Sequence, residues 1–286
     1  MNDTDMMSVL RDHQLARRGL MMTSLMTGLT LATTRVEAQA IHTDTEGLDA
    51  GETKVPSGGV DLPAYYARPQ GNGPFPIIIV NEEVFGVHDH MADICRRLAK
   101  VGYLAVAAEV YARIADLGKV SNSSQVQQIV ARSPDAQEMS DLDATVQWAM
   151  ANKGDGSRLG TTGFCRGGRT TWLYAIHNPN LKAAVAWYGN VMGTPSEAHP
   201  QRVIDLADQL KCPLLGLYGG QDNFAKAGDA KEAAAKARAA GRTVEIVVYD
   251  DAPHGFNADY RPSYRAADAA DGWKRMLEWF RKYGVA

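Results

Sequence analysis

Of the three cysteines in the chain, Cys165 has the surroundings of a catalytic nucleophile. It lies in the sequence GFCRGG, which follows the apolar run RLGTT and precedes a helical pattern. A sharp strand-to-helix turn of this kind lifts a nucleophile clear of a sheet, and glycines flank it because larger side chains would collide with neighbouring backbone. The start of a helix also favours a thiolate and presents the amide of Arg166 to an oxyanion. The pattern predicts a nucleophile elbow with cysteine in place of serine.

Two further residues follow Cys165 in the order nucleophile, acid, histidine. Asp222 ends the sequence YGGQD after the apolar run LLGLY, and His254 lies in DDAPHGF after VEIVVY. A histidine can take the thiol proton, while a carboxylate fixes the histidine tautomer and stabilises the imidazolium. Each residue alone is also compatible with an ordinary turn or loop, and Cys165 alone with a buried structural cysteine. Their shared order after three apolar runs predicts a Cys–His–Asp triad.

The elements that must position these residues alternate between apolar runs and amphipathic stretches. This alternation predicts an α/β fold of the α/β-hydrolase type, with a mostly parallel central sheet and helices on both faces. The polar segment between Val120 and Pro134 is interpreted as an excursion over the sheet, not as a domain boundary. We expect strands over 76–80, 103–108, 158–164, 182–188, 213–218 and 243–249, and helices over 91–101, 170–176, 231–240 and 264–283.

Together with EEVFGV at 82–87 and VYAR at 110–113, the segments GFCRGG, YGGQDNF and APHGF resemble the dienelactone hydrolase family. The resemblance extends from about Val60 to the C-terminus. In that family a glutamate contacts the nucleophile and helps to set its protonation state, which implies this role for Glu83. The amide after that glutamate completes the oxyanion hole, so the resemblance implies Val84 as a donor beside Arg166. It further implies hydrolysis of an ester or lactone through a thioester, without a cofactor.

The sequence specifies the substrate less well. In the family, arginine and tyrosine side chains bind a substrate carboxylate, and this chain has no clear match at those positions. Nearby arginines could substitute, and aromatic residues at the end of a strand could line the pocket, although such residues often have structural roles only. The candidate substrate-binding residues are Tyr111, Arg113, Arg169, Trp187, Tyr188 and Arg261.

Two alternative functions remain open. One is a general carboxylesterase for neutral acyl esters. The other is a non-catalytic or redox-sensing relative, in which a reactive Cys165 is oxidised or binds a ligand without turnover. The presence of both His254 and Asp222 argues against the second alternative.

The composition limits the partners of the protein. With 30 Lys and Arg against 33 Asp and Glu, the formal net charge is -3, so no overall basic charge favours nucleic acid or an anionic membrane. We expect a small-molecule ester or lactone as partner, and a monomer or small homo-oligomer. Three widely spaced cysteines fit neither a disulfide framework nor a zinc site. His88 and His90 have H-x-H spacing, but no third ligand is indicated nearby, so no metal is expected.

The first 40 residues have the pattern of an export signal. Arg17 and Arg18 precede a short apolar run, and an A-x-A site ends at Ala40. The paired arginines indicate the twin-arginine route and a periplasmic location, with a single catalytic domain over 41–286. The apolar run is too short and too rich in Thr and Gly for a stable membrane anchor. An N-terminal helix that lies on a membrane is the alternative.

Overall fold

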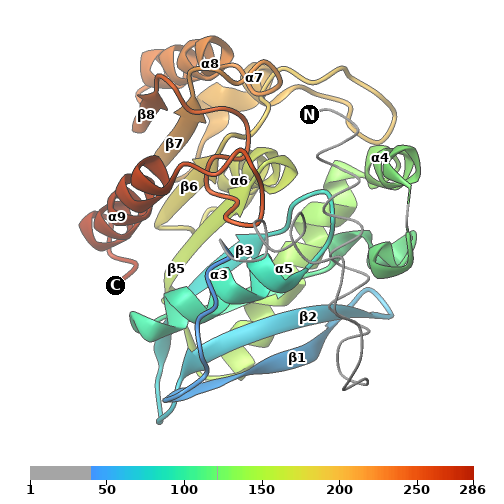
Figure 1. Cartoon of the computed structure of the whole chain (residues 1–286), viewed down its shortest axis with the longest axis vertical. Helices are drawn as coiled ribbons and strands as arrows, with labels where there is room; N and C mark the ends of the chain where they lie inside the picture. The colour runs from blue at the N-terminus through green and yellow to red at the C-terminus, as the bar shows by residue number, and fades with distance from the viewer. Residues whose placement is uncertain (1–39, 121) are drawn as a thin grey trace, which may run out of the picture.

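Strands of small and β-branched residues form a single mixed sheet in the computed structural model, which describes residues 40–120 and 122–286 (Figure 1). Within this part of the chain, the strand order is β1-β2-β4-β3-β5-β6-β7-β8. Only β1 and β2 run antiparallel to their neighbours, and the remaining strands pair in parallel. The strands are β1 Leu48–Ser57, β2 Val60–Pro69, β3 Phe75–Asn81, β4 Leu104–Ala108, β5 Gly154–Phe164, β6 Ala183–Trp187, β7 Leu214–Gly219 and β8 Val244–Tyr249.

Helices cover both faces of this sheet. The helices are α3 Asp89–Lys100, α4 Ser123–Ala131, α5 Asp135–Ala151, α6 Arg166–His177, α7 Val203–Leu206, α8 Ala227–Ala239 and α9 Ala266–Lys282, with short 3-10 turns η1 Val110–Arg113, η2 Leu117–Lys119 and η3 Ala207–Gln209. The predicted α/β-hydrolase architecture is therefore confirmed. Two features differ from the prediction: the antiparallel β1–β2 pair, and the segment before Pro134, which contains α4 and leads into the long helix α5.

The side chains of β3 show how the strands divide the core between the two faces. Ile77 and Ile79 pack with α5 and α6, whereas Ile78 and Val80 point to the opposite face and pack with α3 and α9. This alternation is the two-residue period of a strand that is buried on both sides. In Figure 1, α3 and α9 lie on the side of the sheet that faces the viewer.

The sheet topology brings the candidate catalytic residues to one edge. Cys165 directly follows β5, Asp222 follows β7 and His254 follows β8, and these strands run parallel. The strand order reverses between β3 and β5, because the chain leaves β3 for β4 on one side and returns to β5 on the other. Ligands bind at such switch points, beyond the carboxyl ends of the strands. Glu83 follows β3 and Cys165 follows β5, so both lie at this position.

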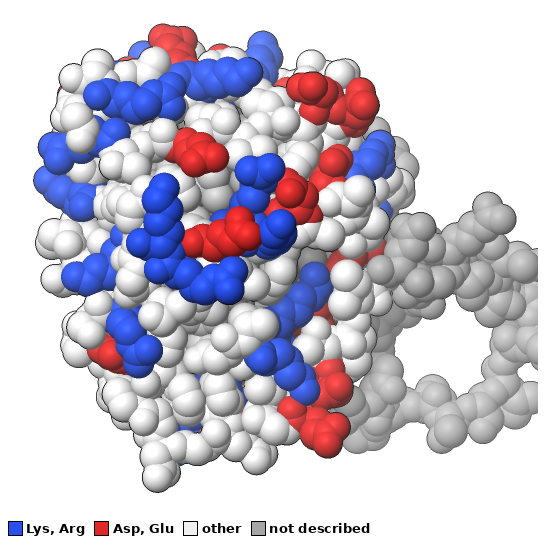
Figure 2. Space-filling view, turned by 90° about the vertical axis from the view of Figure 1, so that its left-hand side faces the viewer, with Lys and Arg blue, Asp and Glu red and all other residues white. Residues whose placement is uncertain are grey.

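Both signs of charge are distributed over the face shown in Figure 2, where Lys and Arg side chains are interspersed with Asp and Glu. A surface of this kind does not generate a large field of one sign. Among residues 40–120 and 122–286, no helix has the length and apolar character that a membrane crossing requires. The expected signal segment, apart from Ala40, lies outside the described residues.

Candidate active site

The turn that holds Cys165 is strained, as an elbow requires. Cys165 has a positive φ of 56° and is the residue that precedes the first turn of α6. A Cβ atom at Gly163 would lie 2.4 Å from the carbonyl oxygen of Gly167, and one at Gly167 would lie 2.2 Å from that of Asn81. Side chains at these two positions would therefore push the elbow away from β3. The glycines of GFCRGG are needed for close backbone packing, which in turn fixes the nucleophile above the sheet.

Cys165, His254 and Asp222 form a continuous chain of contacts. The Nε2 atom of His254 lies 3.1 Å from the Sγ atom of Cys165, and its Nδ1 atom lies 2.7 Å from Oδ2 of Asp222. The other carboxylate oxygen, Oδ1, accepts hydrogen bonds from the amides of Phe224 and Ala225, at 2.8 and 2.9 Å. Because both oxygens are engaged, the Asp222 side chain is held in one orientation and fixes the imidazole. The structure thus brings together the three residues predicted from the sequence.

The surroundings of His254 favour its protonated form. Burial disfavours the imidazolium, but the charge of Cys165 and the hydrogen bond with Asp222 outweigh burial and raise the pKa of His254 to about 9. The ring also packs edge-on between Tyr188, at a centroid distance of 5.1 Å, and Phe224, at 5.4 Å. These contacts restrict rotation of the ring. The histidine is therefore placed to keep a proton close to the sulfur at neutral pH.

The two predicted oxyanion donors, Val84 and Arg166, line the same pocket as Cys165 and His254. Arg166 is the first residue of α6, and the amides of the first turn have no partner within a helix. Val84 lies in a tight loop that is closed by the hydrogen bond from the Gly86 amide to the Glu83 carbonyl. Both residues therefore border the pocket that contains the thiol, and backbone amides in such a place can stabilise negative charge on a substrate oxygen.

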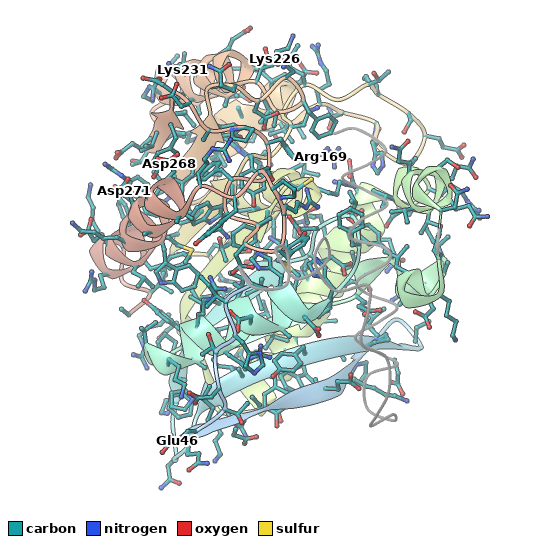
Figure 3. The ribbon with its side chains drawn as sticks, in the orientation of Figure 1. Glu46, Arg169, Lys226, Lys231, Asp268 and Asp271 are labelled. Carbon is teal, nitrogen blue, oxygen red and sulfur yellow. The ribbon has the colours of Figure 1, made fainter. Side chains whose placement is uncertain are left out.

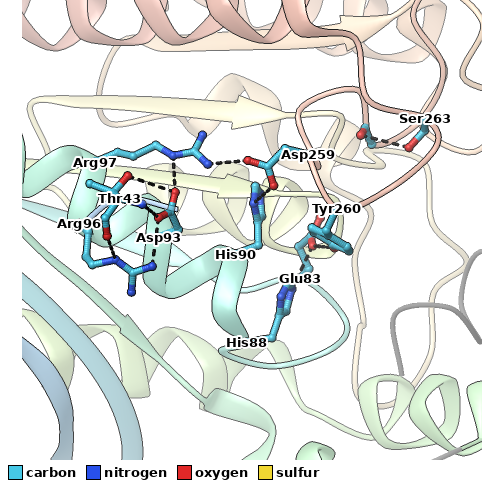
Figure 4. A network of polar contacts seen from close by, with 11 residues as sticks. Thr43, Glu83, His88, His90, Asp93, Arg96, Arg97, Asp259, Tyr260 and Ser263 are labelled. Atoms are coloured by element: carbon cyan, nitrogen blue, oxygen red, sulfur yellow. Dashed lines mark hydrogen bonds and ion pairs between the residues drawn. The ribbon is translucent and has the colours of Figure 1, made fainter. Parts of the chain in front are cut away.

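Glu83 is fully buried and is surrounded by groups that stabilise its negative charge (Figure 4). Its Oε2 atom accepts a hydrogen bond from the Tyr260 hydroxyl and lies 3.2 Å from Nε2 of His88. Burial alone would raise the pKa of this carboxyl, but the positive charge of Arg261 and the hydrogen bond from His88 lower it below its ordinary value. Arg261 also interacts electrostatically with Cys165. Glu83 is therefore an ionised group that is coupled to the nucleophile through Arg261.

The neighbouring Glu82 has the opposite character, although both glutamates are buried. Its Oε1 atom accepts a hydrogen bond of 2.8 Å from the amide of Val110, the first residue of η1. Burial and the nearby charge of Glu109 raise the pKa of Glu82 well above its ordinary value. Glu82 therefore connects the loop after β3 to η1, and its surroundings disfavour a negative charge. Nothing in the spacing of two consecutive glutamates distinguishes these environments.

A second set of polar contacts anchors the loop that carries His254 (Figure 4). Asp259 lies 3.1 Å from Nδ1 of His90 and 2.5 Å from Nη2 of Arg97. Arg97 also contacts Asp93, which accepts a hydrogen bond of 2.6 Å from the amide of Thr43. Contacts thus extend from residue 43 through α3 to the loop after β8. This network was not predicted from the sequence, because residues in contact within it lie up to 169 positions apart.

The histidines of the H-x-H pair do not lie on a strand. His88 precedes α3 and His90 lies within it. Each ring contacts a carboxylate, His88 that of Glu83 and His90 that of Asp259. Within the described ranges, no group of three or more His, Cys, Asp or Glu residues is arranged to hold a metal ion.

A pocket of about 750 Å³ opens over Cys165. Its lining combines apolar side chains, side-chain amides and several basic residues. These come from α4, α6, the segment between β6 and α7, and the loops after β3, β7 and β8. The residues are Val84, Gln127, Val130, Ala131, Cys165, Arg166, Arg169, Asn190, Met192, Gly193, Thr194, His199, Gln201, Arg202, Phe224 and His254.

Of the six candidate substrate-binding residues, only Arg169 belongs to this lining. The prediction that Arg113 binds substrate is corrected by its contacts. Its guanidinium binds the buried Asp141 at 2.7 Å and the Ser57 carbonyl at 2.6 Å, and so fixes the turn between β1 and β2. Trp187 is buried in the core and stacks on Phe164. The other three lie behind the lining: Tyr111 is buried, Tyr188 packs against His254, and Arg261 lies over the rings of Phe85 and Tyr260.

Comparison with known proteins points to one family. Residues 62–284 match the family model described as "Dienelactone hydrolase family". A protein of Methylorubrum extorquens named "Putative carboxymethylenebutenolidase" is 52% identical over 99% of both chains, and one of the same name from Escherichia coli K12 is 50% identical over 92% of this chain and 98% of that protein. The crystal structure of a "Putative Dienelactone Hydrolase" from Klebsiella pneumoniae is 50% identical, with a TM-score of 0.80, and the match covers 82% of this chain and 99% of that one.

Proposed function

Because the chain belongs to the dienelactone hydrolase family, we propose that it cleaves its substrate with a Cys165–His254–Asp222 triad through a thioester acyl-enzyme. Membership of the family makes it a hydrolase of lactone or ester bonds. The observation that carries the proposed mechanism is the chain of contacts from Sγ through the imidazole to a carboxylate with both oxygens engaged. A nucleophile, a base and an orienting acid thus follow β5, β8 and β7 at one edge of the sheet.

The first step of the proposed reaction forms the thioester. The Cys165 thiolate attacks the substrate carbonyl carbon, and the carbonyl oxygen becomes an oxyanion between the amides of Val84 and Arg166. When this intermediate collapses, the carbon–oxygen bond to the alcohol breaks and the His254 imidazolium donates its proton to the leaving oxygen. In a lactone that oxygen stays attached to the acyl chain. Asp222 keeps the Nδ1 proton of His254 in place throughout.

The second step returns the enzyme to its starting state. Neutral His254 takes a proton from water, the hydroxide attacks the thioester carbon, and the carbon–sulfur bond breaks to release a carboxylic acid and the thiolate. All protons are exchanged through His254, so the step uses no cofactor. Esters and lactones suit this chemistry because their leaving groups are better than those of amides. Glu83 tunes the nucleophile through the opposing charge of Arg261.

Substitution of each cysteine in turn tests the assignment of the nucleophile. Cys165→Ala should reduce hydrolysis of short 4-nitrophenyl esters and neutral lactones by orders of magnitude, as loss of a triad member does. Cys95→Ala and Cys212→Ala are matched controls, because both thiols are buried outside the pocket. Full activity in Cys165→Ala would refute the mechanism. Reversible oxidation of Cys165 without any turnover by the unmodified protein would support a redox-sensing role instead.

We also propose that the protein reaches the periplasm by the twin-arginine route, as a single domain over 41–286. The support for this is Arg17 and Arg18, the apolar run that follows them, and the A-x-A site at Ala38–Ala40. The N-terminal sequence of exported protein should begin near Ile41. Retention of Met1, or loss of export only when the Sec route is blocked, would contradict the proposal.

A further inference from the structure

We infer that the pocket selects neutral esters over esters that carry a carboxylate on the acyl chain, because each arginine that lines it is already paired with a carboxylate of the protein. This inference rests on the proposed function and specifies its substrate class. Three arginines and two histidines in one lining would ordinarily indicate an anion-binding site. The partners of these residues lead to the opposite conclusion.

Arg169 is neutralised by Asp135, the first residue of α5. Its Nη1 and Nη2 atoms donate to the two carboxylate oxygens at 2.6 and 2.8 Å, which is the bidentate geometry that binds a guanidinium most firmly. Nδ1 of His199 lies 2.9 Å from the same carboxylate. The backbone amide of Asp135 donates to the Ala198 carbonyl, which fixes the acid in place. The charge that Arg169 brings to the pocket is therefore already compensated.

Arg166 is paired with Glu138, one turn further along α5, through a single hydrogen bond. Its Nη2 atom donates to Oε1 of Glu138 at 2.8 Å, and Oε2 of this fully buried carboxylate accepts from the Thr170 hydroxyl at 3.2 Å. The wall formed by α5 and α6 thus holds two cations and two anions. A substrate carboxylate placed here would have to displace one of these internal partners.

At the rim of the pocket, Arg202 binds Asp205 through two hydrogen bonds of 2.8 Å. This pair is exposed to solvent, so water and salt weaken any attraction that it exerts on an anion.

The remaining lining suits an uncharged acyl chain. Val84, Val130, Ala131 and Met192 contribute apolar surface, and Phe224, half exposed at 50%, presents a ring beside His254. The other polar side chains include the neutral amides of Gln127, Asn190 and Gln201. A carboxylate that enters such a pocket loses its hydration without gaining a full positive charge in return. A neutral chain of the same shape does not incur this loss.

The unmodified full-length protein provides the first test. 4-Nitrophenyl 4-oxopentanoate and the 4-nitrophenyl monoester of succinic acid have the same leaving group and nearly the same acyl shape, but only the second is charged. We expect kcat/KM to be about tenfold or more higher for the neutral ester, a ratio equivalent to 1.4 kcal/mol. Equal or faster hydrolysis of the charged ester would overturn the inference but leave the proposed function intact. Hydrolysis of neither ester would overturn the proposed function and the inference with it.

Asp135→Asn provides the second test, because it releases Arg169 and His199 without changing the size of the side chain. We expect the preference for the neutral ester to shrink by about tenfold or to reverse, mainly through a lower KM for the charged ester. Asp271→Asn is the matched control: it changes the net charge equally, but Asp271 lies on α9, well separated from Arg169 in Figure 3 and outside the lining. An equal shift in both variants, or a shift in neither, would overturn the inference.

Discussion

Two clusters of buried charged side chains flank Cys165. One is built around an anion and the other around two cations, but in both clusters the charges are paired. On one side, Glu83 is an anion stabilised by His88, Tyr260 and Arg261. On the other, the cations Arg166 and Arg169 are paired with Glu138 and Asp135. Each cluster is compensated internally, because an unpaired charge in either place would be costly to bury.

Because the charges in both clusters are already paired, the groups that are free to react lie between them. Between two balanced clusters, the groups that can exchange a proton with a substrate are the sulfur of Cys165 and the imidazole of His254, 3.1 Å apart. The clusters hold Cys165 and His254 in position, and only these two residues exchange protons or form bonds with the substrate. Substitutions in the pair should therefore abolish turnover, whereas substitutions in either cluster should change its rate, selectivity or pH dependence.

The largest effect is expected from loss of the base. His254→Ala should lower kcat for 4-nitrophenyl butyrate by about 10³-fold or more, because neither proton transfer nor the thiolate is then supported. His177→Ala, at the exposed end of α6, is the control and should retain activity within about twofold. If His254→Ala kept more than a tenth of the wild-type rate, the proton would have to pass through a group in one of the flanking clusters.

The pH dependence of kcat/KM should differ between esters that need the His254 proton for their alcohol to leave and esters that do not. Its pKa is raised to about 9, so the proton that it donates is present at neutral pH and is lost as the pH rises through about 9. Ethyl esters need this proton for ethanol to leave, whereas 4-nitrophenolate leaves without it. Above pH 9, kcat/KM for an ethyl ester should fall by about tenfold per pH unit, and that for a 4-nitrophenyl ester much less. Parallel profiles would show that another group donates the proton.

Removal of the charge of Glu83 tests the first cluster. In Glu83→Gln, Arg261 loses an opposing charge and attracts negative charge on the sulfur of Cys165 more strongly. We expect iodoacetamide to alkylate Cys165 about tenfold faster. Turnover should fall at the same time if Glu83 also positions the sulfur. Unchanged rates of alkylation and turnover would place this carboxylate outside the site.

The smallest effect on turnover is expected at Arg113, which the structure places away from the pocket. Arg113→Met leaves Asp141 buried without its guanidinium, so the free energy of unfolding in urea should fall by roughly 3 kcal/mol. At 25 °C, kcat/KM should stay within about twofold of wild type. A tenfold rise in KM with unchanged stability would restore Arg113 as a substrate-binding residue.

The sequence could predict that Cys165, Asp222 and His254 each follow a strand, because a run typical of a buried strand precedes each of them and ends at a glycine or polar turn. It therefore placed Cys165, Asp222 and His254 on one edge, where the structure brings them into contact. The amphipathic β1 and β2 were not predicted, since only three of the ten residues in each strand are buried.

The walls of the site could not be predicted in this way. Whether Arg169 binds a substrate or Asp135 depends on how α5 packs beside α6, and no spacing specifies that pairing over 34 positions. For the same reason the sequence did not separate Arg113 from Arg169, or reveal that Asp259 anchors the loop of His254. Local pattern determines which residues follow strands, whereas long-range packing determines which charges are already satisfied.

The central claim is that the acyl group passes through the sulfur of Cys165, and the site of acylation tests this claim most directly. The full-length protein is mixed with 4-nitrophenyl pivalate, whose branched acyl group slows the second step. The mixture is then quenched in acid for intact-mass and peptide analysis. We predict a mass increase of one pivaloyl group, confined to the peptide that contains Cys165 and absent in Cys165→Ala. Turnover without an adduct on Cys165, or an adduct on another residue that persists in Cys165→Ala, would contradict the account.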